Sequence, residues 1–245
     1  MPFSGRKAFS LVPESVEISM GKQSYSSVLG SEKLSTNAHL TEIITRVGQR
    51  IATQANRPDY AWEFKLIDKN EQNAFCLPGG KIAIYTGILP IAKNEAGLAT
   101  VMAHEVTHAI ARHGGQRMSL ALASMGGLFL LQQTTLKDKD PRTQGLILGA
   151  LGAGLAVGVV LPYSRSHEIE ADEVGQTLMA KAGYDPSESI HFWGRFATIA
   201  KSNTPSLLST HPSSQDRANN MKERLPASLR DYQAAPQQYG LGALF

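Results

Sequence analysis

The sequence predicts an α+β protein that is mostly helical and carries one small β-sheet. Apolar side chains recur with helical spacing over residues 35–55, 95–113 and 164–182, as expected for helices that pack on a core. Apolar and charged residues alternate over 62–66, and the segment KIAIYT at 81–86 is rich in isoleucine and aromatic residues, which indicates two short strands. Because the strands are few and the helices long, helices should form most of the fold.

Composition excludes several classes of protein. The 245 residues are 42% apolar and 18% charged, with a net charge of +3 and one cysteine. This apolar fraction is too high for a disordered chain, and one cysteine cannot form an internal disulfide. A charge this small gives no strong field for nucleic acid, so we expect no nucleic-acid partner. The start of the chain has no apolar run of signal-peptide length, so the protein is made without a signal or is a mature fragment.

The remaining segments predict the domain organisation. Further helices are expected over 116–133, 143–162, 186–201 and 213–224. Residues 1–33 show no helical or strand period, and the tail from Pro226 is expected to be extended. The predicted domains are an N-terminal extension (1–34), one domain (35–224) that includes an apolar helical hairpin (116–162), and a C-terminal tail (225–245).

The hairpin allows three interpretations. Residues 118–131 and 145–161 are apolar, and the second run has no charge over its 17 positions but contains five glycines. A buried hairpin of a soluble protein is favoured, because both runs are short for a membrane span. Contact of residues 118–161 with a membrane surface or a partner is the first alternative, and a true span is the second.

The strongest chemical signal is the segment HEVTH at 104–108. His104 and His108 are four residues apart on a predicted helix, so both imidazoles can face one ion, and Glu105 can reach a water beside it. Zinc suits imidazole ligands and lowers the pKa of bound water to about 7. The alternative is a set of satisfied polar residues in a core. His113, five residues after His108, is expected to be a solvated histidine.

A catalytic zinc ion needs a third protein ligand. A histidine six residues after His108 is absent, since that position is Gly114. The helix over 164–182 offers a carboxylate instead, because Glu168 and Asp172 lie on its apolar face. We expect Glu168 to be the third ligand and Asp172 to accept a hydrogen bond from a ligand histidine or an arginine. Glu170 falls on the polar side and is expected to be solvated.

Three motifs in order point to a family. HEVTH at 104–108 is followed by SRSHEIEAD at 164–172 and THPSSQDR at 210–217. Over about residues 35–224 this combination resembles metallopeptidase family forty-eight, the minigluzincins, which include HtpX, BepA and the CAAX prenyl proteases. It is most similar to small periplasmic or lipoprotein members and to the Oma-like peptidase domain. The resemblance implies a gluzincin-type zinc metallopeptidase core with a sheet over the active-site cleft.

The resemblance also implies residue roles. His104, His108 and Glu168 would hold one Zn²⁺ per chain, and Glu105 would act as general base. Asp172, His211 and Arg217 would also contribute to catalysis. His211 would either donate to the oxyanion or act as a fourth ligand that blocks the site, and Arg217 would anchor its loop on Asp172 or Glu168. A surface position remains the alternative for both.

The segment before the zinc helix suggests substrate binding. An extended peptide can add to an exposed strand edge, and the strand at 81–86 is a candidate through Lys81, Ile82 and Ala83. Gly79 and Gly80 would let the preceding turn approach the cleft. An internal strand is the alternative. Cys76 is expected to be a small core residue.

The predicted function is a zinc-dependent metalloendopeptidase that acts on unfolded or membrane-associated polypeptides in cell-envelope protein quality control. The alternative is a chaperone-like or binding factor of the envelope with a latent zinc site plugged by His211. A structural zinc domain is a third option, although such a site has no need of Glu105. The resemblance suggests the bacterial periplasm or envelope, with a lipid anchor in the full-length precursor.

Overall fold

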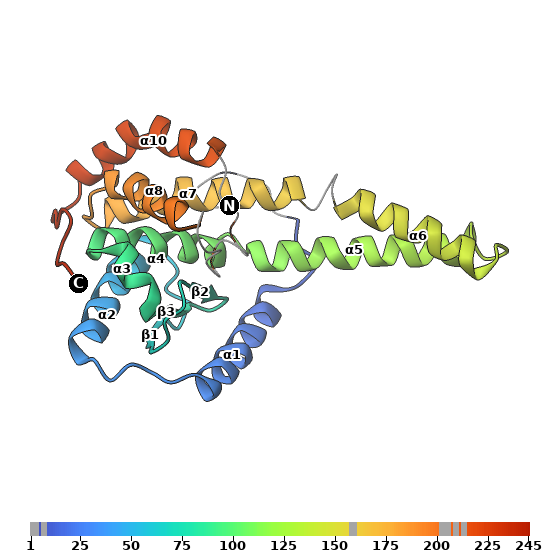
Figure 1. Ribbon diagram of the computed structural model, residues 1–245, viewed down its shortest axis with the longest axis horizontal. Coiled ribbons are helices and arrows are strands. Elements are labelled where there is room, and N and C mark those ends of the chain that lie inside the picture. Colours follow the sequence, from blue (N-terminus) through green and yellow to red (C-terminus); the bar gives the residue numbers. More distant parts are fainter. Residues whose placement is uncertain (1–4, 6–8, 157–160, 201–206, 208–210, 212–214) are drawn as a thin grey trace.

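A three-stranded sheet and a layer of helices enclose one buried helix in the computed structural model (Figure 1). The structure describes residues 5, 9–156, 161–200, 207, 211 and 215–245. The helices are α1 (Glu14–Ser31), α2 (Ala38–Gln54), α3 (Leu89–Ala92), α4 (Glu95–Ile110), α5 (His113–Thr134), α6 (Pro141–Leu155), α7 (Leu161–Lys181), α8 (Ser187–Ala200) and α10 (Gln215–Gln233), with a 3-10 turn η1 (Thr86–Ile88). The predicted α+β, mostly helical class is confirmed.

The sheet consists of β1 (Glu63–Ile67), β2 (Ala74–Leu77) and β3 (Lys81–Tyr85) in the order β1-β3-β2. β3 runs parallel to β1, with Glu63 opposite Lys81, and antiparallel to β2, with Ala74 opposite Ile84. The expectation that a peptide adds to β3 through Lys81, Ile82 and Ala83 is therefore wrong, because both edges of this strand are already paired. Among the described residues, β2 has a neighbour on one side only.

The turn between β2 and β3 needs its two glycines because of its backbone conformation and its close packing. Gly79 and Gly80 have φ values of 87° and 82°, which side chains with a Cβ rarely adopt. A Cβ on Gly80 would lie 2.7 Å from the ring of Trp62, and one on Gly79 would lie 3.1 Å from Ile18 on α1. The turn thus packs against α1 and Trp62, and its approach to the cleft stays a prediction.

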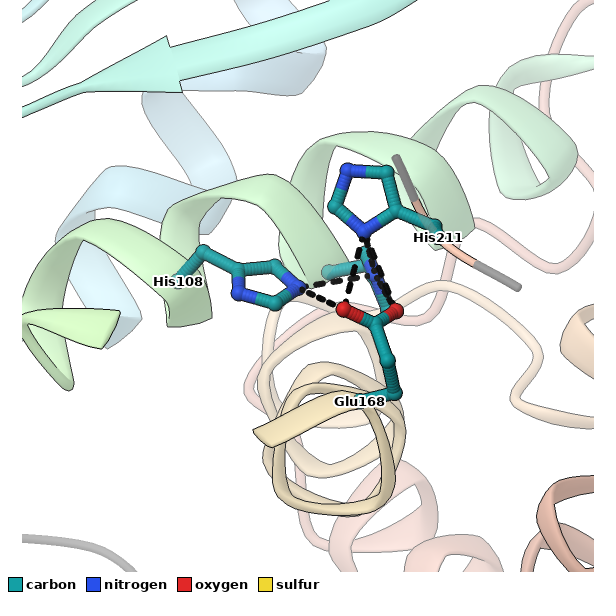
Figure 2. Close-up of side chains that lie close together, drawn as sticks. His108, Glu168 and His211 are labelled. Carbon is teal, nitrogen blue, oxygen red and sulfur yellow. Dashed lines mark hydrogen bonds and ion pairs between the residues drawn. The ribbon is translucent and has the colours of Figure 1, made fainter. Parts of the chain in front are cut away.

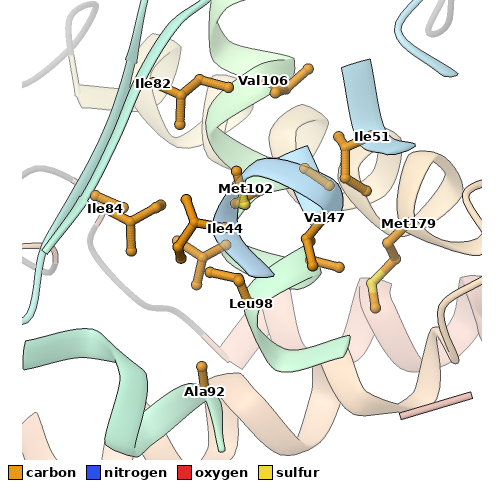
Figure 3. Close-up of a cluster of buried hydrophobic side chains, with 14 of the residues drawn as sticks. Ile44, Val47, Ile51, Ile82, Ile84, Ala92, Leu98, Met102, Val106 and Met179 are labelled. Atoms are coloured by element: carbon orange, nitrogen blue, oxygen red, sulfur yellow. The ribbon is translucent and has the colours of Figure 1, made fainter. Parts of the chain in front are cut away.

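Helix α4 forms the centre of the core, and every one of its residues is buried. Isoleucines and the one valine of α2, isoleucines of β3 and Met179 of α7 surround its side chains (Figure 3). Gly175 of α7 lets that helix approach closely, since a Cβ there would lie 3.0 Å from the backbone nitrogen of His104. The close approach of the α4 and α7 backbones therefore brings the polar, ionisable side chains of the two helices next to each other.

Two terminal segments differ from the expectation. Residues 14–31 form the helix α1, although the sequence of 1–33 shows no apolar period. The period is missing because the side that α1 buries consists of Glu17, Gly21 and Tyr25, which do not form an apolar stripe. The expected extended tail is also partly wrong, since α10 continues through Pro226 to Gln233 and packs on α7 and α8. The division into extension, domain and tail remains a prediction.

The apolar hairpin is not buried. Helices α5 and α6 project from the body as an arm (Figure 1). α5 buries residues only in its first two turns, and α6 buries none. The favoured expectation of a packed hairpin is wrong, because no other element covers this arm in the part of the chain that the structure describes. In that part, no helix combines the length and the apolar character that crossing a membrane requires.

Candidate metal centre

Two histidines of α4 face one glutamate of α7. His104 Nε2 lies 3.1 Å from His108 Nε2 and 3.4 Å from Glu168 Oε2, and His108 Nε2 lies 3.4 Å from Glu168 Oε1. The spacing of four residues places both imidazoles on one side of α4, as predicted. Figure 2 shows Glu168 pointing from α7 into this group.

His211 completes a group of four. Its Nδ1 lies 3.0 Å from Glu168 Oε2 and 3.3 Å from His104 Nε2, and all four side chains are buried. The backbone N–H of His211 donates to the carbonyl of Leu207, whose own N–H donates to the carbonyl of Gln72. The residues between and after them (208–210 and 212–214) lie outside the described part of the chain. The surface alternative for His211 is wrong.

The four ligand atoms have the spacing that zinc needs. They lie within 4.8 Å of one another, and the measured pairs fall between 3.0 and 3.4 Å. Two ligands at about 2.1 Å from a tetrahedral ion are about 3.4 Å apart. Three imidazole nitrogens and a carboxylate are also ligands that zinc accepts. The residues therefore fit a zinc ion.

Glu105 borders the group without belonging to it. Its Oε1 is buried and makes no hydrogen bond within the described part of the chain, although it lies 3.3 Å from His211 Nε2. An unsatisfied buried carboxylate oxygen is costly. Its position beside the ligand atoms suits a group that binds a water or a substrate there.

Comparison with known proteins identifies the family. A model of peptidase family M48 matches residues 38–225. The chain belongs to peptidase family M48. This confirms the resemblance that the three motifs indicate.

The Mitochondrial metalloendopeptidase OMA1 of Schizosaccharomyces pombe is 34% identical to this chain over 92% of this chain and 66% of that protein. OMA1 of Saccharomyces cerevisiae is 32% identical over 95% of this chain and 70% of that protein. The Beta-barrel assembly-enhancing protease of Escherichia coli is 29% identical over 96% of this chain and 50% of that protein.

The M48 chain spans between 50% and 70% of the length of these three relatives. The expected location in the bacterial periplasm or envelope is wrong as a conclusion, because relatives from S. pombe, S. cerevisiae and Arabidopsis thaliana are mitochondrial proteins by name.

A carboxylate and an arginine lie behind His104 in this M48 domain. His104 Nδ1 is 3.0 Å from Asp172 Oδ1, and Arg217 donates to both Asp172 oxygens, with Nη2 2.8 Å from Oδ1. Arg217 Nη1 also lies 3.3 Å from Glu168 Oε2 and 3.5 Å from the carbonyl oxygen of His211. Asp172 thus contacts both a histidine, His104, and an arginine, Arg217, the two kinds of partner expected for it. Arg217 is buried rather than at the surface.

A histidine lies behind His108, and two expectations fail there. His113 Nδ1 is 2.8 Å from His108 Nδ1, and His113 Nε2 is 3.4 Å from Glu170 Oε2. His113 is 0% exposed and Glu170 3% exposed, so the prediction that both are solvated is wrong. The sequence pattern treats α4 and α7 as isolated helices, whereas His113, the first residue of α5, contacts both His108 of α4 and Glu170 of α7.

The electrostatics of the M48 site favour one bound cation. Burial lowers the pKa of His108 well below 6.5. Burial alone would lower the pKa of His104 as well, but hydrogen bonds with Asp172 and Glu168 raise it to about 9. Burial would raise the pKa of Glu168, but hydrogen bonds from His104 and His211 hold it far below its usual range. The Glu168 carboxylate therefore stays ionised and attracts a positive charge.

The edge strand β2 borders the M48 site. Burial, together with the nearby charge of Glu105, raises the pKa of the Cys76 thiol on this strand. Cys76 is half-buried and packs against the core, as expected. Trp193 of α8, which the sequence analysis did not single out, packs edge-on against His104 at 5.4 Å between ring centroids. A single tryptophan has no local pattern that would have indicated this contact.

Proposed function

We propose that this chain is a zinc-dependent metalloendopeptidase. His104, His108 and Glu168 are its zinc ligands, Glu105 is its general base, and the ion belongs beside the unsatisfied Oε1 of Glu105. The observation that carries the proposal is a buried set of ligand atoms at the spacing of a tetrahedral ion, next to that carboxylate. Membership of peptidase family M48 supports the same reaction.

The chain's own residues divide the work of hydrolysis. When bound, zinc supplies a Lewis acid that polarises the scissile carbonyl and acidifies a water. Glu105 takes the proton of the attacking water at its carboxylate and returns it to the leaving amine. Asp172 accepts from His104 Nδ1–H, which leaves the Nε2 lone pair free for the ion. Arg217 keeps Asp172 ionised and in place.

The position of His211 favours a latent resting state. Its Nδ1 lies at the distance of a fourth ligand, and its Nε2 is next to Glu105. A site with four protein ligands has no open position for substrate. We therefore propose that His211 plugs the zinc site, and that its withdrawal opens it. A binding or chaperone-like factor with a permanently closed site is the second candidate function.

Substrates are proposed to be unfolded or membrane-associated polypeptides, in a protein quality-control role. The free edge of β2 supports this, because an extended backbone can pair with it beside Glu105. Extended backbone is most available in unfolded chains. β2 thus takes the role that the sequence analysis assigned to β3.

The arm of α5 and α6 is proposed to contact a membrane surface. No charged residue occurs between Arg117 and Lys137, or from Thr143 to Ser164. Large apolar side chains are exposed along both helices: Leu122, Met125, Phe129, Leu130, Leu146 and Leu151. Apolar surface this extensive on both helices is suited to the boundary of a lipid bilayer.

One substitution separates hydrolysis from metal binding. Glu105→Gln should retain zinc, measured by metal analysis of the purified protein, but lose digestion of denatured casein, because the amide cannot take a proton. Glu223→Gln, at an exposed position of α10, is the matched control and should keep both properties. Casein digestion by Glu105→Gln at the wild-type rate would refute the mechanism.

A second substitution separates the open and plugged states. If His211 blocks the ion, His211→Ala should raise the rate of casein digestion while zinc stays bound to the remaining three ligands. If His211 instead donates to the oxyanion, the rate should fall, by about 10²–10³-fold. A fall would exclude the plugged state, and no digestion by either protein would favour the binding factor.

A further inference from the structure

His108 is supported from behind by a buried chain of hydrogen-bonding groups. Its Nδ1 meets His113 Nδ1 at 2.8 Å, and His113 Nε2 faces Glu170 Oε2 at 3.4 Å. The ring of His167 stacks on that of His113, with 4.1 Å between centroids and 9° between planes. These groups lie on the side of His108 away from Glu168, outside the ligand set.

The contacts determine where the protons are. Two imidazole nitrogens at 2.8 Å can share only one proton. Glu170 accepts from His113 Nε2–H, so His113 Nδ1 has a free lone pair and accepts from His108 Nδ1–H. The lone pair of His108 is then on Nε2, the atom that faces His104 and Glu168. The arrangement therefore selects the tautomer of His108 that can bind an ion through Nε2.

A break in the helix creates this contact. On a continuous helix, residue 113 would lie about 140° around the axis from His108. Arg112 instead adopts a left-handed conformation, with φ of 54°, and separates α4 from α5. Its guanidinium donates to the carbonyl of Val12 at 2.7 Å and to Glu17 of α1. The bend is thus fixed by the N-terminal segment, and it returns His113 to His108.

We propose that His113 is a positioning residue, which holds His108 in the orientation and tautomer that binds zinc. His104 has a carboxylate behind it, whereas His108 has a second imidazole linked to Glu170. His113 touches neither the ligand atoms nor the substrate edge and acts through His108. The inference rests on the proposed function, because it needs a zinc ion at His108.

Two variants at position 113 test the role. His113→Leu introduces an apolar side chain of similar bulk and removes the acceptor atom Nδ1. It should weaken zinc binding about 10–100-fold. His113→Asn carries a side-chain oxygen close to the position of Nδ1 and should keep an affinity near that of the wild type. The affinity is measured by competition with a chromophoric chelator. His191→Leu, at an exposed position of α8, is the control and should leave the affinity unchanged.

A spectroscopic measurement distinguishes positioning from loss of packing. Ring ¹⁵N shifts of His108 in the zinc-free protein should report Nδ1–H in the wild type and in His113→Asn, and a mixture with Nε2–H in His113→Leu. Thermal unfolding of the zinc-free variants shows whether each is folded. Equal zinc affinity in His113→Leu and the wild type, or an equal loss in both variants, would overturn the inference alone. A wild-type protein that bound no zinc would overturn the proposed function with it.

Discussion

Arg217 and Asp172 form a buried ion pair directly behind His104. Arg217 Nη2 lies 2.8 Å from Asp172 Oδ1, and that same oxygen lies 3.0 Å from His104 Nδ1. Burial alone would raise the pKa of Asp172, but the Arg217 guanidinium and His104 together lower it. One arginine is therefore linked through Asp172 to His104 of the candidate metal centre.

Removing this arginine should unfold the protein more easily. Arg217→Met leaves Asp172 buried without its cation, and should lower the free energy of unfolding by about 3–5 kcal/mol. Urea unfolding of the zinc-free protein gives the value. Lys33→Met, which removes an exposed partner of Asp68, should have little effect. Similar small changes in both variants would show that the buried pair contributes little.

Two adjacent glycines at the start of α5 should respond in opposite ways to alanine. A Cβ on Gly115 would overlap the carboxylate of Glu17, whereas a Cβ on Gly114 meets nothing within 4 Å. Gly115→Ala should therefore lower the free energy of unfolding by about 1–3 kcal/mol. Gly114→Ala should raise it by about 0.5–1 kcal/mol, because alanine favours the helix. Equal effects would show that α1 does not pack on this turn as described.

The stability of the fold should depend on pH through Glu95. Burial would raise the pKa of Glu95, but hydrogen bonds from Arg46 and Tyr184 lower it below 4.5. A depressed pKa contributes stability above pH 4.5 that is lost as the pH falls through the folded-state value.

Glu95→Gln should reveal this contribution. The variant should be less stable than the wild type at about pH 7, and the difference should shrink as the pH falls below about 4.5. Urea unfolding at several pH values measures it, and Glu223→Gln should follow the wild type throughout. A difference that stayed constant with pH would mean that the Glu95 carboxylate is not the group that titrates.

The arm should bind phospholipid vesicles. The double substitution Met125→Ser and Phe129→Ser removes two side chains that are 68% and 59% exposed. If both enter the bilayer boundary, the loss should weaken partitioning by at least about a hundredfold. Flotation with vesicles gives the bound fraction. Val16→Ser with Met20→Ser, at exposed positions of α1, is the matched control. Dimerisation through the arm without lipid binding would contradict the membrane proposal.

Local helix geometry made part of the site predictable. His104 and His108, and likewise Glu168 and Asp172, are four residues apart, so each pair shares one side of its helix wherever that helix lies. Their burial followed from apolar neighbours on the same side. The structure brings these four residues together, along with His211 and Arg217, whose proximity the resemblance implied.

Other predictions failed because they depended on which elements pack against each other in the tertiary structure. His113 and Glu170 look solvated on their own helices, but the bend at Arg112 brings His113 against His108 and Glu170. α1 went unrecognised because its buried side is made of Glu17, Gly21 and Tyr25. The hairpin was expected to be buried because its composition is apolar. Composition gives the apolar character of a segment but does not show whether another element packs on it.

The sequence by itself determined the fold class, the helices that carry HEVTH and Glu168, and the family. These depend on periodicity and on motif order, which are properties of the chain along its length. The tertiary structure alone decided that β3 is central and β2 the edge, and that His113 contacts His108. The reason is physical: strand order and contacts between distant residues arise from packing in three dimensions, which no local spacing encodes.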